Sequence, residues 1–151
     1  MDWAAFTQRA PALATLGEER FGSAGLALVG TLRRDGWPRI SPVDVYVADG
    51  HLYVGMESGT LKALDLLRDP RITVHSVIAG RGGTEGEFKV YGRAEDVRDP
   101  SRRERFEATV NERLSETFTN AAYHLFEVDI ESAASVTIEG GERATQIWKA
   151  D

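Results

Sequence analysis

The chain has 151 residues, the size of one ordinary domain, so we expect a single domain over residues 1–151 without separate cofactor and substrate lobes. Its 18 Lys and Arg against 24 Asp and Glu give a net charge of −6, with no basic block, which speaks against general nucleic-acid binding. The absence of cysteine excludes disulfides, Cys-ligated metals and thiol catalysis, and no apolar run approaches the roughly 20 residues that span a bilayer. We therefore expect a soluble, cytoplasmic protein with no membrane or nucleic-acid partner.

The N-terminal segment predicts a helix. Apolar residues recur at spacings of three and four from Trp3 to Leu16, and Asp2 is a plausible N-cap. Pro11 is expected to kink this helix or to divide it in two.

Three strands are predicted in succession after Gly25. The apolar run 26–32 is typical of a strand buried on both faces, and Asp-Gly turns at 35–36 and 49–50 lead into strands 39–47 and 51–56. Pro42 lies inside the second of these strands. Because proline cannot donate to a ladder, we expect it to mark an edge, a bulge or an opening of the sheet.

The second half of the chain continues the antiparallel pattern. The expected elements are a short helix from about 61 to 68, a strand at 72–78, a mobile glycine-rich loop at 79–86, a strand at 87–97, a charged helix from Pro100 to about 114, strands at 123–130 and 134–139, and a tail at 147–148. Seven short strands with one small crossover helix predict a mainly β fold, a six- to seven-stranded antiparallel barrel with two or three helices.

No hydrolytic or nucleotide motif is present. The chain lacks Gly-x-Ser-x-Gly, His-Glu-x-x-His and a Gly-Lys-Ser/Thr loop, and the stretch 81–84 is interpreted as a flexible loop. The three histidines fall on separate predicted strands without a metal-ligand spacing, so we expect no metal site and assign no catalytic side chain.

The start of the short helix has the features of an anion site. If Thr60 is the N-cap, Lys62 lies in the first turn, where free N–H groups, the hydroxyls of Ser58 and Thr60, and an ammonium group would meet. The alternative is an ordinary exposed lysine with Glu57 as its counter-charge. The residues alone favour neither interpretation.

The order of these elements resembles that of the pyridoxamine-phosphate-oxidase-like, flavin-binding split β-barrel family, over almost the whole chain. The resemblance depends on S-G-T-L-K at 58–62, R-D-P-R at 68–71 and K-V-Y-G-R-A at 89–94. It implies a split β-barrel homodimer that binds FMN, or alternatively the deazaflavin F420, at each subunit interface. The cofactor-binding residues it implies are Arg39, Ser41, Pro42, Val43, Ser58, Thr60, Lys62 and Lys89.

The resemblance also implies a role for each of these residues. Lys62, with Ser58 and Thr60, would hold the phosphate. Arg39 and the backbone at 41–43 would lie along the ring system and the ribityl chain, and Lys89 would approach from a neighbouring strand. Family oxidases that act on pyridoxamine phosphate carry Arg where this chain has Leu61 and Lys where it has Asp44, which speaks against vitamin B6 oxidation.

The function implied is that of a flavin-dependent oxidoreductase, which transfers hydride to or from an unidentified small molecule. A non-enzymatic flavin- or haem-binding protein and a cofactor-free dimeric scaffold are the alternatives. Trp148 is expected either to cover the cofactor or to pack in the core.

Overall fold

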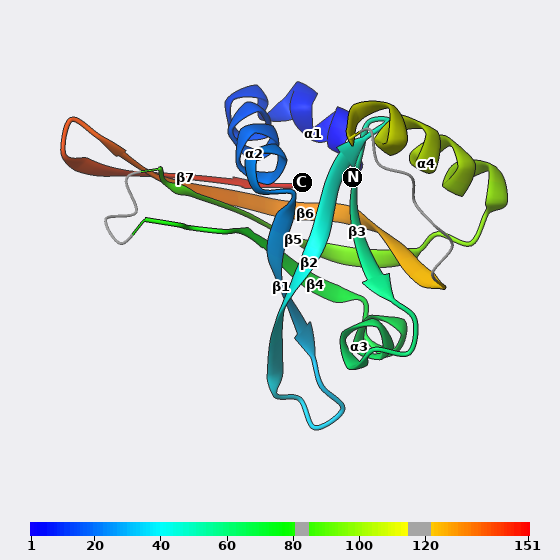
Figure 1. Ribbon diagram of the computed structural model, residues 1–151. Helices are drawn as coiled ribbons and strands as arrows, with labels where there is room; N and C mark the ends of the chain where they lie inside the picture. Colours follow the sequence, from blue (N-terminus) through cyan, green and yellow to red (C-terminus); the bar gives the residue numbers. More distant parts are fainter. Residues whose placement is uncertain (81–84, 115–121) are drawn as a thin grey trace.

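The computed structural model, which describes residues 1–80, 85–114 and 122–151, is an antiparallel sheet curled into a barrel, with helices at its ends (Figure 1). Its elements in chain order are α1 (Trp3–Arg9), α2 (Pro11–Ala24), β1 (Leu26–Leu32), β2 (Pro38–Ala48), β3 (His51–Glu57), α3 (Leu61–Arg68), β4 (Arg71–Ser76), β5 (Glu87–Asp96), α4 (Pro100–Leu114), β6 (Tyr123–Glu139) and β7 (Glu142–Lys149). The strand order is β3-β2-β1-β4-β5-β6-β7, and a further β3–β6 pairing closes the barrel. The barrel therefore has six strands, with β7 as an additional strand, and the prediction of the fold is confirmed.

The predicted N-terminal helix is divided at Pro11. Asp2 caps α1 by accepting a hydrogen bond from the Ala5 amide at 2.7 Å, and Pro11 opens α2, which ends at Gly25 with a φ of 63°. Together α1 and α2 lie across one end of the barrel (Figure 1). The division at Pro11 also explains why the described residues form four helices where two or three were predicted.

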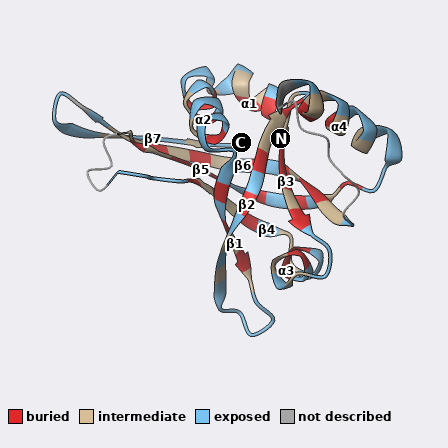
Figure 2. Cartoon of the chain, in the orientation of Figure 1, coloured by how far each residue is buried: buried red, intermediate tan, exposed pale blue. Residues whose placement is uncertain are grey.

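Buried residues, red in Figure 2, occur along the barrel strands and on parts of the helices. The aromatic centre of this core consists of Trp3, Phe6, Phe21 and Phe88, whose ring centroids lie 5.3 to 6.5 Å apart in tilted or edge-to-face pairs. A smaller apolar cluster lies beneath α4. Within the described part of the chain, no helix is long and apolar enough to cross a membrane.

The prediction that β1 is buried on both faces is wrong. Residues alternate along β1, so that Ala27 and Val29 are fully buried whereas Leu26 and Leu28 are 44% and 38% exposed. The unbroken apolar run arises because the outward-facing positions are apolar too. This strand therefore contributes an uncovered apolar strip to the outside of the barrel.

The two strands predicted at 123–130 and 134–139 are one 17-residue strand, β6. The strand bends without breaking, because the β5–β6 register shifts between Tyr91 and Gly92. A Cβ atom at position 92 would lie 2.1 Å from the Asp129 carbonyl oxygen, so only glycine fits at this bend. The predicted loop at 79–86 includes residues 81–84, which lie outside the described residues.

Candidate functional site

The barrel opens beside Pro42. The β2–β3 ladder ends at the pair Asp44–Gly55, while β3 continues to Glu57 against β6. Strand β2 in turn remains paired to β1, with Pro42 opposite Leu28. The two strands therefore separate next to Pro42, where an opening of the sheet was one of the predicted alternatives.

The segment that leads from β3 into α3 lies beside this split. Gly59 makes the turn with a φ of +79°, and the Ser58 amide donates to the Ala122 carbonyl at 3.0 Å. The Thr60 hydroxyl donates to the Glu57 carbonyl at 2.8 Å, so it closes the turn and does not cap the helix. Among the described residues, no side-chain cap hydrogen bond is formed at the N-terminus of α3, which leaves its first N–H groups available to an anion.

Lys62 lies in the first turn of α3 and is half-buried. Within the described residues its ammonium group has no ion-pair partner, and the counter-charge considered above, Glu57, forms no ion pair with it. A half-buried cation at the positive end of a helix dipole is unfavourable unless an anion joins it.

Arg39 is fixed by a carboxylate on α3. Its Nε atom lies 2.7 Å from Asp65 Oδ2, the Thr31 hydroxyl donates to the same oxygen at 3.0 Å, and Arg68 lies 3.3 Å from Oδ1. Burial alone would raise the pKa of Asp65, but hydrogen bonds from Arg39, Thr31 and Arg68 outweigh it and lower that pKa. Asp65 therefore stays ionised and locks α3 to the β1–β2 hairpin.

The outer face of the sheet is defined by register. One row of facing residues crosses the strands from Pro42 through Leu28, His75 and Lys89 to Ala134. Lys89 lies three strands, roughly 14 Å, from Pro42 and pairs with Glu87 at 2.7 Å. The structure thus gathers seven of the eight predicted site residues around the split and leaves Lys89 on the outer face, away from them.

Two of the gathered residues have restricted access. The Val43 side chain is only 4% exposed and belongs to the core, so only its backbone is available to a ligand. Ser41 pairs with Val29 on the inward side of β2 and is half-buried.

Each of the three histidines contacts a different carboxylate. His51 contacts Glu127 at 2.8 Å, His75 contacts Glu87 at 3.4 Å, and His124 contacts Asp96 at 3.2 Å. The described residues contain no group of three side chains that could hold a metal ion. Trp148 packs edge-to-face against Phe6, at 5.0 Å between ring centroids, which is the core-packing alternative.

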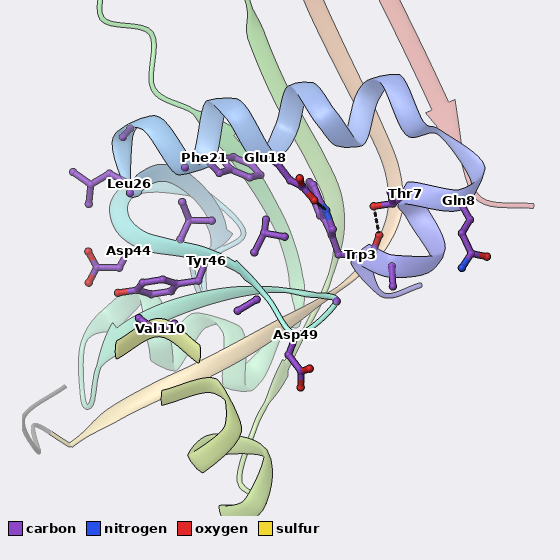
Figure 3. Close-up of a pocket in the computed structure, with 18 residues that line it drawn as sticks. Trp3, Thr7, Gln8, Glu18, Phe21, Leu26, Asp44, Tyr46, Asp49 and Val110 are labelled. Atoms are coloured by element: carbon purple, nitrogen blue, oxygen red, sulfur yellow. Dashed lines mark hydrogen bonds between the residues drawn. The ribbon is translucent and has the colours of Figure 1, made fainter. Parts of the chain in front are cut away.

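A cavity of about 1000 Å³ lies at the other end of β2, between that strand and helices α1, α2 and α4 (Figure 3). Its apolar walls include Trp3, Phe21, Leu26, Tyr46 and Val110. The sequence did not predict this cavity, because its walls come from elements that are distant in the chain.

The burial of Asp65 is not indicated by its spacing in the sequence. Asp65 and Asp69, four residues apart, indicate a solvated helix face, yet Asp65 is only 4% exposed. The available signal was the cation Arg39 on a neighbouring strand, since a carboxylate is rarely buried without a partner.

Comparison with protein families identifies the fold. The family model described as pyridoxamine 5'-phosphate oxidase matches residues 14–137, which is most of the chain. The match begins within α2 and ends within β6. No curated protein matches.

Solved structures with the same fold differ in what they bind. An FMN-binding protein from Nostoc punctiforme, related to pyridoxamine 5'-phosphate oxidase, has a TM-score of 0.69 at 12% identity, covering 94% of this chain and 90% of that one. The haem storage protein HutZ from Vibrio cholerae has a TM-score of 0.64 at 17% identity, covering 81% and 89%. A haem-binding protein from Mycobacterium smegmatis has a TM-score of 0.65 at 14% identity; 87% of this chain aligns with 57% of that one.

Proposed function

Because this chain belongs to the pyridoxamine 5'-phosphate oxidase-like family of FMN-binding split barrels, we propose that it binds a phosphate-bearing flavin at the split beside Pro42 and acts as an oxidoreductase. FMN is the proposed cofactor and F420 the alternative. The substrate is a small molecule to or from which hydride is transferred.

One observation carries the proposal: Lys62 is a half-buried cation without an ion-pair partner in the described chain, at a helix N-terminus that no side chain caps. These donors suit a phosphate, which brings negative charge and several acceptor oxygens. Arg39 lies close by, since the Asp65 that binds it is one helical turn from Lys62.

The residues around the split fit the proposed cofactor. Lys62 and the first N–H groups of α3 would hold the phosphate, with the Ser58 hydroxyl as a further donor. Arg39 and the backbone at 41–43 would line the ring, where the separated strands leave Pro42 exposed. A bound flavin would supply hydride transfer, so no nucleophilic side chain is needed and the protein would bind and orient the reactants.

We also propose that two copies pair through the outer face of the sheet. Leu28, Ile40 and Tyr91 lie on this face and are 38% to 74% exposed. The chain exposes 8674 Å², whereas a compact monomer of its mass exposes about 7,600 Å². A two-fold partner would cover this apolar surface and complete the site.

The first test is the visible spectrum of the purified protein and the mass of any ligand it releases. If the protein contains flavin and a reduced nicotinamide donor can reduce it, the oxidoreductase function is supported. If flavin is bound but no donor reduces it, a non-enzymatic flavin carrier is supported. If the protein binds neither added FMN nor added F420, the proposal is contradicted.

The second test is Lys62→Ala, titrated with FMN, F420 and riboflavin. Loss of one charge-assisted contact is expected to weaken FMN and F420 binding about tenfold to hundredfold, with little change for riboflavin, which lacks the phosphate. Lys149→Ala is the matched control, because Lys149 is an exposed lysine on β7 without an ion pair in the described chain. Equal losses in the two variants would remove Lys62 from the phosphate site.

A non-enzymatic haem protein is the second candidate, and His75 favours it. This imidazole lies on the outer face, in the same row as Leu28 and Lys89, where an apolar planar ligand could lie against the sheet. Haem titration of wild type and His75→Ala tests it. A Soret shift that depends on His75, without flavin binding, would replace the flavin proposal.

A further inference from the structure

We infer that the cavity between β2 and the N-terminal helices is a second binding site, which takes an organic cation with an apolar body. The cavity measures about 1000 Å³, enough for a molecule the size of a substituted bicyclic amine. None of the eight predicted cofactor-binding residues lines this cavity.

The walls of the cavity suit an apolar body. Tyr46 and Val110 line it on the side of α4, and Leu26, 44% exposed, lines it on the side of β1 (Figure 3). Tyr46 packs edge-to-face on Phe106 at 5.3 Å, which holds the tyrosine ring in place. A fixed aromatic wall favours a flat or cationic guest.

The charges of the cavity are of one sign. Glu18, Asp44 and Asp49 line it, and none of the described lining residues is Lys, Arg or His. Glu18 accepts a hydrogen bond from Trp3 Nε1 at 2.9 Å, and Asp49 lies 3.6 Å from Arg105. Asp44 has no ion-pair partner in the described part of the chain.

Charge complementarity therefore selects the occupant. A flavin phosphate would be repelled here, whereas an ammonium group would find Asp44 beside Leu26, its partner across the β1–β2 ladder. Asp44 also lies two residues from Pro42, on the same face of β2 and roughly 7 Å along the strand. A cation bound at Asp44 would thus adjoin the proposed flavin; this placement alone depends on the proposed function.

The test compares three naphthalene probes that differ in charge: (2-naphthylmethyl)trimethylammonium, 2-naphthylmethanol and 2-naphthylacetate. Isothermal titration of the protein without added flavin is expected to rank them cation, neutral, anion. The cation should bind about tenfold more tightly than the anion. Equal affinities, a preference for the anion, or no binding of the cation at millimolar concentration would overturn the inference.

Variants then assign the preference to the cavity. Asp44→Asn is expected to weaken cation binding about threefold to tenfold and to leave the neutral probe unchanged, and Asp44→Lys is expected to reverse the ranking. Glu131→Gln is the control, because it removes the same charge from an exposed residue that does not line the cavity. Equal effects of Asp44→Asn and Glu131→Gln would show a nonspecific charge effect and refute the site.

These probes keep the two proposals distinguishable. If the cationic probe binds but FMN and F420 do not, the cation site is supported and the proposed flavin site is contradicted. If flavin binds but the cationic probe does not, the flavin site is supported and the cation site is contradicted.

Discussion

The two ends of strand β2 are built from opposite charges. At the N-terminal end, Arg39, Lys62 and Arg68 lie around the split, and the buried Asp65 pairs with the two arginines. At the C-terminal end, the cavity is lined by carboxylates, of which Asp44 has no partner in the described chain. Under the two proposals, one strand thus presents a surface for anions and a surface for cations less than its own length apart. At each end some charges are paired within the fold, as Asp65 is, and others, such as Lys62 and Asp44, have no ion pair among the described residues.

Asp65 is expected to give the largest effect. Asp65→Ala leaves Arg39 and Arg68 without their buried carboxylate and is expected to lower the free energy of unfolding by about 3 kcal/mol. The comparison variant is Asp44→Ala at the other end of β2, expected to change it by less than about 0.5 kcal/mol. Urea denaturation measures both, and similar losses would break the distinction between the two ends.

The cations of the split are expected to differ from one another. Arg39→Ala removes one of three groups that satisfy Asp65 and is expected to cost about 1.5 kcal/mol of ligand-free stability. Lys62→Ala removes a charge that has no ion pair in the described part of the chain, and is expected to leave that stability unchanged or slightly raised. Thermal unfolding of the two ligand-free variants measures this difference in stability. A large loss of stability for Lys62→Ala would show that Lys62 stabilises the fold.

Acid is expected to weaken the contact between Asp65 and Arg39. The folded-state pKa of Asp65 is lowered, so its stabilising contribution is complete above the unfolded value of about 3.9 and is lost as the pH falls through the folded value. The stability difference between wild type and Asp65→Asn should be constant from pH 5 to 8 and shrink below pH 4. Asp69, whose pKa the Arg71 hydrogen bonds lower to about 2, adds to the acid sensitivity of both proteins equally. If the stability difference between wild type and Asp65→Asn instead grew as the pH fell, the ionised state of Asp65 would not be what stabilises the fold.

Pro42→Ala is expected to have the smallest effect. The change restores an N–H donor, yet β3 is already paired with β6 at Met56 and Glu57, so the split should stay open. We expect a stability change below about 0.5 kcal/mol and no new amide protection at residue 42 in hydrogen exchange. Strong protection there would mean that the proline itself keeps the strands apart.

Much of this architecture could be predicted from local sequence. The Asp-Gly turns, the cap at Asp2 and the breaks at Pro11 and Pro70 depend on backbone chemistry that neighbouring residues determine. Pro42 belongs to the same class, because a missing donor limits a ladder wherever the strand lies.

What could not be predicted depends on contacts between distant segments. The burial of Asp65 requires that α3 pack against β1 and β2, and the apolar outer positions of β1 cannot be distinguished in sequence from core positions. Lys89 is placed away from the split by a strand order in which β1 and β4 lie between β2 and β5. The cavity beside Tyr46 likewise exists only once α1, α2 and α4 have assembled around β2.

The closing pairing of the barrel, β3 with β6, has a kinetic consequence. It joins residues such as Tyr53 and Glu127, which are far apart in the chain, so the loop-closure entropy must be lost before these contacts form. During synthesis, β1 to β5 emerge from the ribosome while β3 still has an unpaired edge. The barrel cannot close until residues 123–127 have followed, and this interval is when a nascent chain is most exposed to pairing with the wrong strand.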